Sequence, residues 1–203
     1  MLINNFYDNI ISNQITVYSE DKEARWMFKY LLKDYINNLN IIDIKLGCDT
    51  LLSLLYNDAS YFKNVLFVLD GDKTKVSGKY KDLPQKYQNV IFLPGKASPE
   101  EVIYNYLVHL PVGHEILTDN ANKGISIRYF KEINPLSNPK YKDFSKNREK
   151  YKEWFNDNLT MLNDVSVLKY WKRDNAKEYT DFITQFIKSY NIIASRCNLP
   201  KIQ

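Results

Sequence analysis

The apolar residues of the first half of the chain follow two patterns that alternate along the sequence. Short runs rich in β-branched and aromatic residues are typical of strands, and longer stretches with apolar residues every three or four positions are typical of amphipathic helices. The strand-like runs are ITVYS (15–19), NIIDIKLG (40–47), KNVLFVL (63–69) and NVIFLPG (89–95). The helix-like stretches are 22–36, 48–62 and the segment after Ser98. Short apolar strands that alternate with such helices predict a parallel sheet with helices on both faces, so we expect an α/β domain over 15–110.

The pattern changes after Pro111. Segment 131–158 contains two prolines and a dense run of basic and aromatic residues, which is typical of a linker followed by helices. Between 175 and 196 the apolar residues recur at spacings of three and four, which predicts one amphipathic helix. We therefore expect 111–203 to be a basic and aromatic linker and a helical extension that packs on the core.

Composition places the chain among ordinary globular proteins. It has 203 residues, of which 44% are hydrophobic, enough for the core of one domain with an appendage. The two cysteines, Cys48 and Cys197, lie far apart, which indicates reduced thiols rather than a disulfide scaffold or a zinc ribbon. The N-terminal segment includes acidic Asp8 and does not resemble a signal peptide, and no apolar run is long enough to span a membrane. These features predict a cytoplasmic protein.

The net charge of +4 is distributed unevenly. Residues 1–113 contain 12 basic and 13 acidic side chains, whereas residues 114–203 contain 16 basic and 11 acidic ones. Such an excess of positive charge suits a nucleic-acid partner for the second half. A solvated helical surface gives the same count, so both interpretations stay open.

Acidic residues follow two of the predicted strands. Ser19-Glu20-Asp21 ends the first, with Glu23 one turn into the next helix, and Asp70-Gly71-Asp72 ends the third. Because the carboxyl ends of parallel strands lie at one edge of a sheet, these carboxylates are expected to converge, and their mutual repulsion would be costly without a cation. Taken singly, each acid is also explained by a turn or a helix cap.

A divalent cation would remove that cost. Magnesium prefers hard oxygen ligands and commonly takes one or two carboxylates together with substrate phosphates. The glycine between Asp70 and Asp72 lets the backbone turn tightly, so that both side chains can face one ion. The sequence therefore predicts a metal site where the first and third strands end.

The order of these motifs resembles the TOPRIM domain, which topoisomerases, primases and a group of nucleases share. Strand-Glu (ITVYSE), helix, strand, helix and strand-Asp-x-Asp (VLFVLDGD) follow in the TOPRIM order, and NVIFLPGKASPEEVIYNYL is similar to the next segment of overcoming-lysogenization-defect (OLD) type nucleases. The resemblance implies a Rossmann-like parallel sheet in which Glu20, Asp70 and Asp72 hold Mg²⁺ or Mn²⁺ for phosphodiester chemistry. Many members have a glycine after the first glutamate where this chain has Asp21, which leaves Asp21 and Glu23 as weaker candidate ligands.

Basic residues of the second half are candidates for contact with the substrate. The resemblance implies a lysine or arginine from beyond the sheet near the scissile phosphate, and Lys150 and Lys152 are the candidates for this catalytic role. Further candidates for binding nucleic-acid phosphates are Lys96, Lys140, Lys142, Lys146 and Arg148. A solvated helix face is the competing explanation for the group in 140–152. His109 and His114 lack a cluster of other ligands and are expected to be structural or surface residues.

Together these features predict a nuclease that hydrolyses DNA phosphodiester bonds by a two-metal TOPRIM mechanism. OLD-type proteins join such a domain to an ATPase, and this chain has no GxxxxGK[ST] ATP site of its own; the implied partner is an ATPase domain or subunit, in phage defence or DNA processing. One alternative is a phosphoacceptor receiver-like domain that uses Asp70 and Lys96. Another is a non-catalytic TOPRIM interaction module, and a homo-oligomeric state is left open.

Overall fold

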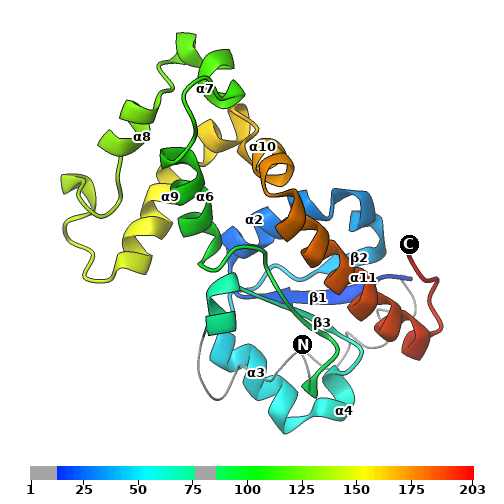
Figure 1. Cartoon of the computed structure of the whole chain (residues 1–203). Coiled ribbons are helices and arrows are strands. Elements are labelled where there is room, and N and C mark those ends of the chain that lie inside the picture. The colour runs from blue at the N-terminus through cyan, green and yellow to red at the C-terminus, as the bar shows by residue number, and fades with distance from the viewer. Residues whose placement is uncertain (1–12, 76–85) are drawn as a thin grey trace. The chain divides into compact units, whose positions relative to one another are not determined.

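A computed structural model of the chain describes residues 13–75 and 86–203 (Figure 1). The contacts divide these residues into two compact units. The first comprises 13–75, 86–97 and 177–203, and the second comprises 98–176. This division differs from the boundary expected after residue 110, because helix 99–108 groups with the second unit and the last helix groups with the sheet.

The first unit contains a four-stranded, all-parallel sheet, which confirms the predicted α/β fold. Its strands are β1 (Ile15–Ser19), β2 (Leu39–Ile41), β3 (Leu66–Leu69) and β4 (Val90–Phe92), in the order β2-β1-β3-β4. In the register of the central pair, Ser19 lies opposite Val68. The chain moves from β1 outward to β2 on one side and through β3 to β4 on the other. The point where this order reverses therefore lies between β1 and β3.

One face of this sheet packs against α3 (Cys48–Asn57) and α4 (Ala59–Phe62). Tyr18 and Phe67 stack on this face with ring centroids 5.9 Å apart. The core that they share with α3 consists of aliphatic and aromatic side chains, among them Leu51, Leu52, Leu55, Phe62 and Leu69. Helix α3 begins at Cys48, after Gly47 in the N-cap position.

The last helix, α11 (Ala176–Cys197), belongs to the sheet unit together with α2 (Lys22–Leu31) and the 3₁₀ helix η1 (Lys33–Asn38). The rings of Tyr35 and Phe186 lie 5.4 Å apart, which joins η1 to α11. The side-chain oxygen of Gln185 accepts a hydrogen bond from the backbone N–H of Phe92 at 3.2 Å. Because β4 is the outermost strand, α11 thereby covers a sheet edge that would otherwise expose a backbone donor.

The second unit is helical. Its α-helices are α6 (Pro99–Val108), α7 (Glu115–Asp119), α8 (Ile127–Glu132), α9 (Asn147–Asp164) and α10 (Val167–Asp174), with the 3₁₀ helices η3 (Ala121–Lys123) and η4 (Pro139–Tyr141). Helix α6 packs against α8, α9 and α10. Trp154 of α9 is fully buried and meets the ring of Tyr104 edge-on at 5.1 Å.

His114 has a structural role in this unit, as expected. Its Nδ1 accepts the N–H of Ile116 and caps α7, and its Nε2 lies 2.8 Å from Asp174 Oδ2. Because Nδ1 is an acceptor, the Nε2 nitrogen carries the proton in this arrangement. Among the helices of the described ranges, none combines the length and apolar character needed to cross a membrane.

Candidate functional site

The acids that follow β1 and β3 meet at the carboxyl edge of the sheet. Glu20 directly follows β1 and Asp70 directly follows β3. The Glu20 carboxylate accepts a hydrogen bond from the backbone N–H of Asp70, with Oε1 and N 3.0 Å apart. This contact lies where the strand order reverses, and parallel sheets usually bind their ligands outside that point.

Both acids are deeply buried. The exposed fraction is 4% for Glu20 and 0% for Asp70. A carboxylate can stay ionised in such surroundings only if hydrogen bonds and positive charge replace the water that it has lost. The backbone N–H of Asp70 supplies one such hydrogen bond to Glu20, and a lysine supplies positive charge.

That lysine is Lys73, in the 3₁₀ helix η2 (Gly71–Lys75) that follows β3. Its ammonium group lies 3.2 Å from Asp72 Oδ2 and 3.9 Å from Glu20 Oε2, and its side chain is 12% exposed. Lys73 is not among the site residues predicted from the sequence. The available signal was its position directly after Asp-Gly-Asp, at the same edge of the sheet.

No side chain fits at position 71, which is occupied by a glycine. A Cβ atom at this position would collide with the carbonyl oxygen of Gly95 and come within 2.9 Å of the carbonyl oxygen of Leu93. Gly71 has no left-handed φ, and the chain turns after β3 into the 3₁₀ helix that begins at Gly71. The glycine also lets the loop after β4 pack directly against the Asp-Gly-Asp segment.

Asp21 and Glu23, the weaker candidate ligands, belong to the start of α2. Asp21 is the N-cap residue, and its Oδ1 accepts the N–H of Ala24 at 3.0 Å. Glu23 is buried in the first turn, where a negative charge interacts favourably with the helix dipole. The helix-cap explanation therefore accounts for Asp21.

The acidic residues Glu20, Asp70 and Asp72 have the charge and the type of donor atom that a divalent cation requires. Glu20, Asp70 and Asp72 present hard carboxylate oxygens, and the Lys73 ammonium already stands as a cation beside two of them. Within 13–75 and 86–203, no three His, Cys, Asp or Glu side chains are gathered closely enough to enclose a metal ion. Lys73 links the Glu20 and Asp72 carboxylates, and the backbone of Asp70 contacts Glu20, but these side chains do not form a three-ligand metal site in this structure.

The negative charge of this edge extends to Cys48, the first residue of α3. Burial, together with the Glu20 carboxylate, raises the pKa of the Cys48 thiol to about 12. Cys48 therefore remains a neutral thiol at physiological pH and is not a poised nucleophile.

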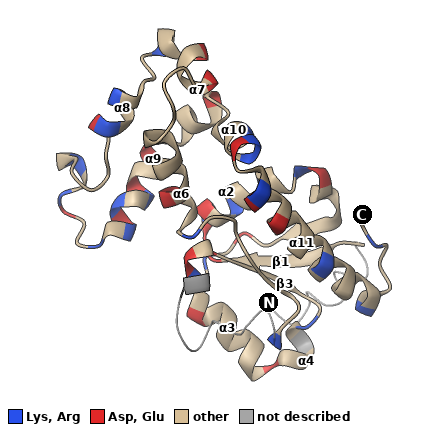
Figure 2. Ribbon diagram, in the orientation of Figure 1, with Lys and Arg blue, Asp and Glu red and all other residues tan. Residues whose placement is uncertain are grey.

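The basic candidates of the second half lie in the second unit. Lys150, Lys152 and Arg148 are on α9, and blue bands mark such residues there in Figure 2. Lys140 is held by Asp157, whose Oδ2 lies 2.7 Å from its ammonium and also accepts the Tyr141 hydroxyl. Lys142 and Lys146 are exposed. Asp157 pairs with the exposed Lys140, and the catalytic and phosphate-binding roles of all these residues stay predictions.

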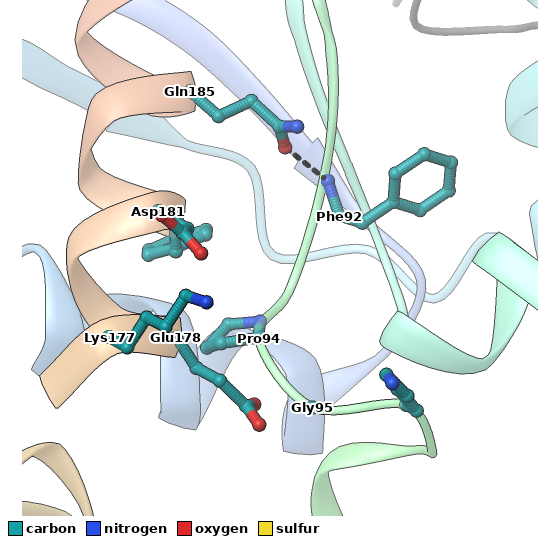
Figure 3. Close-up of a pocket in the computed structure, with 9 residues that line it drawn as sticks. Phe92, Pro94, Gly95, Lys177, Glu178, Asp181 and Gln185 are labelled. Carbon is teal, nitrogen blue, oxygen red and sulfur yellow. Dashed lines mark hydrogen bonds between the residues drawn. The ribbon is translucent and has the colours of Figure 1, made fainter. Parts of the chain in front are cut away.

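Lys96 lines a pocket of about 430 Å³ between the loop after β4 and the first turns of α11. Figure 3 shows Lys177, Glu178 and Asp181 on α11 facing Pro94 and Gly95 across it. Cations and carboxylates share this wall, so it presents mixed charge rather than a purely phosphate-binding surface.

Comparisons with known proteins identify no relative. No protein-family model, no curated protein and no solved structure gives a significant match to this chain. The resemblance to TOPRIM domains therefore rests on the motif order alone, and the functional interpretation depends on the geometry of Glu20, Asp70, Asp72 and Lys73.

Proposed function

We propose that the protein is a divalent-metal-dependent nuclease that hydrolyses phosphodiester bonds in DNA. The observation that carries this proposal is the hydrogen bond between Asp70 N–H and Glu20 Oε1. It joins the backbone of Asp70 to the buried Glu20 carboxylate where the order of a parallel sheet reverses, the usual position of ligand sites in such folds. Asp72 and Lys73 lie on the next turn of the chain.

The side chains divide into two roles. Glu20, Asp70 and Asp72 would hold Mg²⁺ or Mn²⁺, which when bound would activate a water molecule and stabilise the leaving oxygen. Lys73 provides positive charge beside Glu20 and Asp72, and it would stabilise the negative charge that develops on a phosphate at this edge. Lys150 and Lys152 are proposed as further positive groups of the active complex.

The proposed substrate is DNA because the excess of positive charge is concentrated in the half that contains α9. Phosphate contacts by such residues give affinity that does not depend on sequence and that falls with salt. An ATPase domain or subunit is the proposed partner, on the basis of the resemblance to OLD-type nucleases. Phage defence and DNA processing are the roles that this pairing suggests.

A nuclease assay with matched variants tests the proposal. Plasmid, linear and single-stranded DNA and RNA are incubated with Mg²⁺ or Mn²⁺ and with wild-type protein, Glu20→Gln or Asp70→Asn. Both changes should abolish metal-dependent cleavage, whereas Asp34→Asn, the same change at an exposed residue of η1, should leave it intact. Cleavage that survives both substitutions would refute the proposed site.

A receiver-like phosphoacceptor domain is the second candidate, because it also places acids after the first strand and an aspartate after the third. In that case a small phosphodonor should label Asp70, and Asp70→Asn should remove the label. Against this function, Asp70 is followed by Gly71 and Asp72 rather than by the bulky residue and proline usual in receivers. Labelling without metal-dependent cleavage would replace the nuclease proposal with this one.

A further inference from the structure

A small basic pocket lies at the opposite edge of the sheet from Glu20 and Asp70. It has a volume of about 220 Å³, and its walls include Lys63, Lys86 and Arg196. Lys63 comes shortly before β3 and Lys86 shortly before β4, whereas Arg196 lies in the last turn of α11. Three cations from separate segments of the first unit thus line one cavity, and no acidic side chain of the described residues lines it.

Arg196 is held in place by neutral groups. One guanidinium nitrogen donates to the carbonyl oxygen of Lys63 at 2.8 Å, and another donates to the side-chain oxygen of Gln88 at 3.3 Å. These two bonds fix the plane of the guanidinium without neutralising its charge. A guanidinium has five N–H donors in a rigid fork, so donors remain for an anion in the same plane.

Lys86 is positioned in a similar way. Its ammonium lies 5.3 Å from the ring centroid of Tyr56 and 5.2 Å from that of Tyr87, and these two rings meet edge-on. Aromatic faces attract a cation but carry no net charge. Arg173, in contrast, lies 2.8 Å from both Glu115 and Asp174. In the described ranges no carboxylate pairs with Lys63, Lys86 or Arg196, so the pocket keeps its positive charge.

We propose that this pocket, which we call the Arg196 pocket, binds a phosphate group. The Arg fork with two lysine ammonium groups matches the charge and donor geometry that phosphate recognition uses. The cavity is smaller than the roughly 300–1,000 Å³ of pockets for drug-sized ligands. It therefore suits a single phosphate with part of its sugar rather than a whole cofactor. The phosphate comes either from a nucleic-acid backbone or from a free or terminal phosphate.

The position of the pocket makes it an anchoring site. In parallel sheets, ligands that react bind at the carboxyl ends of the strands, and the Arg196 pocket lies at the amino ends of β3 and β4. The inference does not depend on the proposed nuclease activity, because phosphate binding here needs neither Glu20 nor a metal ion.

Binding measurements on the full chain test the proposal. In EDTA at physiological salt, three probes are titrated: inorganic phosphate, a single-stranded oligonucleotide with a 5′-phosphate, and the same oligonucleotide with a 5′-hydroxyl. Arg196→Gln, Lys63→Gln and Lys86→Gln should each weaken binding about tenfold or more, since each removes one cation from the site. Lys188→Gln, the same change at an exposed position of α11, should have little effect.

The pattern among the probes identifies the source of the phosphate. Equal binding of the two oligonucleotides indicates a backbone phosphate, whereas preference for inorganic phosphate and the 5′-phosphate indicates a free or terminal one. If Arg196→Gln disturbs α11, the Lys63→Gln variant still tests the pocket. It removes only the lysine charge and keeps the backbone carbonyl oxygen to which Arg196 donates. The proposal is overturned if no probe binds, or if Lys188→Gln weakens binding as much as the pocket variants do.

Discussion

Lys73 supplies positive charge beside a glutamate with an exposed fraction of only 4%. Without that charge, Glu20 would be an incompletely compensated buried carboxylate, which is costly. We expect Lys73→Met to lower the free energy of unfolding by about 1–3 kcal/mol. The free energy of unfolding is measured by urea denaturation of four proteins: wild type, Lys73→Met, Glu20→Gln and the double variant. The double variant should recover much of the loss, and independent, additive effects would contradict the proposed charge compensation.

Gly71 provides a second test at the scale of a residue. An added methyl group would meet the backbone of the loop after β4, which cannot move as a flexible side chain would. We expect Gly71→Ala to cost about 1–3 kcal/mol or more in unfolding free energy. Gly47→Ala is the control, because a Cβ there meets nothing within 4 Å and its φ is −61°. Similar stabilities of the two variants would show that the loop and the Asp-Gly-Asp segment do not pack as described.

At the scale of single elements, the hydrophobic pattern predicted most strands and the last helix, but not which residues of that helix contact the sheet. Periodicity placed one amphipathic helix at 175–196, and α11 runs from Ala176 to Cys197. The tail was expected to pack on the core, whereas individual contacts such as that of Gln185 with Phe92 are not encoded in any local pattern. The meeting of Glu20 and Asp70 could be predicted because parallel strands end at one edge. The position of Lys73 directly after Asp-Gly-Asp was visible in the sequence, but its contacts with Glu20 and Asp72 depend on the conformation of η2 and could not be predicted.

The contact between α11 and β4 gives a prediction at this scale. Gln185→Ala removes the acceptor of the Phe92 N–H and leaves an edge-strand donor without its protein partner. We expect a loss of about 1–3 kcal/mol in unfolding free energy and faster amide hydrogen exchange at Phe92. Thr184→Ala, at the neighbouring exposed position, should change that exchange rate little. Unchanged protection of Phe92 in Gln185→Ala would mean that α11 does not cover this edge.

For the whole molecule, the run of basic residues at 140–152 predicts that this part of the second unit contributes to binding DNA. Lys150→Gln combined with Lys152→Gln should weaken binding and make its dependence on salt less steep, because fewer counterions are released. Lys140→Gln should have a smaller effect than Lys150→Gln alone, because Asp157 already pairs with Lys140. Fluorescence anisotropy at several salt concentrations measures both quantities. An unchanged salt slope in the double variant would remove α9 from the proposed DNA surface.

The tyrosines of the second unit should make the free energy of unfolding fall as the pH rises into the alkaline range. Burial, followed by the charge of Tyr151, raises the pKa of Tyr104 to about 12, and burial also raises the pKa values of Tyr106, Tyr141 and Tyr151. An unfolded tyrosine ionises near pH 10. The folded state therefore holds protons that the unfolded state has lost, so these phenols contribute stability fully below about pH 10 and lose it as pH rises toward their folded pKa values.

We expect the midpoint of thermal unfolding to fall between pH 9 and pH 12, with tyrosinate absorbance appearing together with unfolding rather than before it. Tyr104→Phe cannot ionise, so it should make the fall of unfolding free energy less steep, by up to about 1.4 kcal/mol per pH unit. Tyr56→Phe, at an exposed position of the first unit, is the control. If Tyr104→Phe and wild type lose stability with the same slope, the Tyr104 phenol does not keep its proton in the folded state, and its burial against Trp154 is not as described.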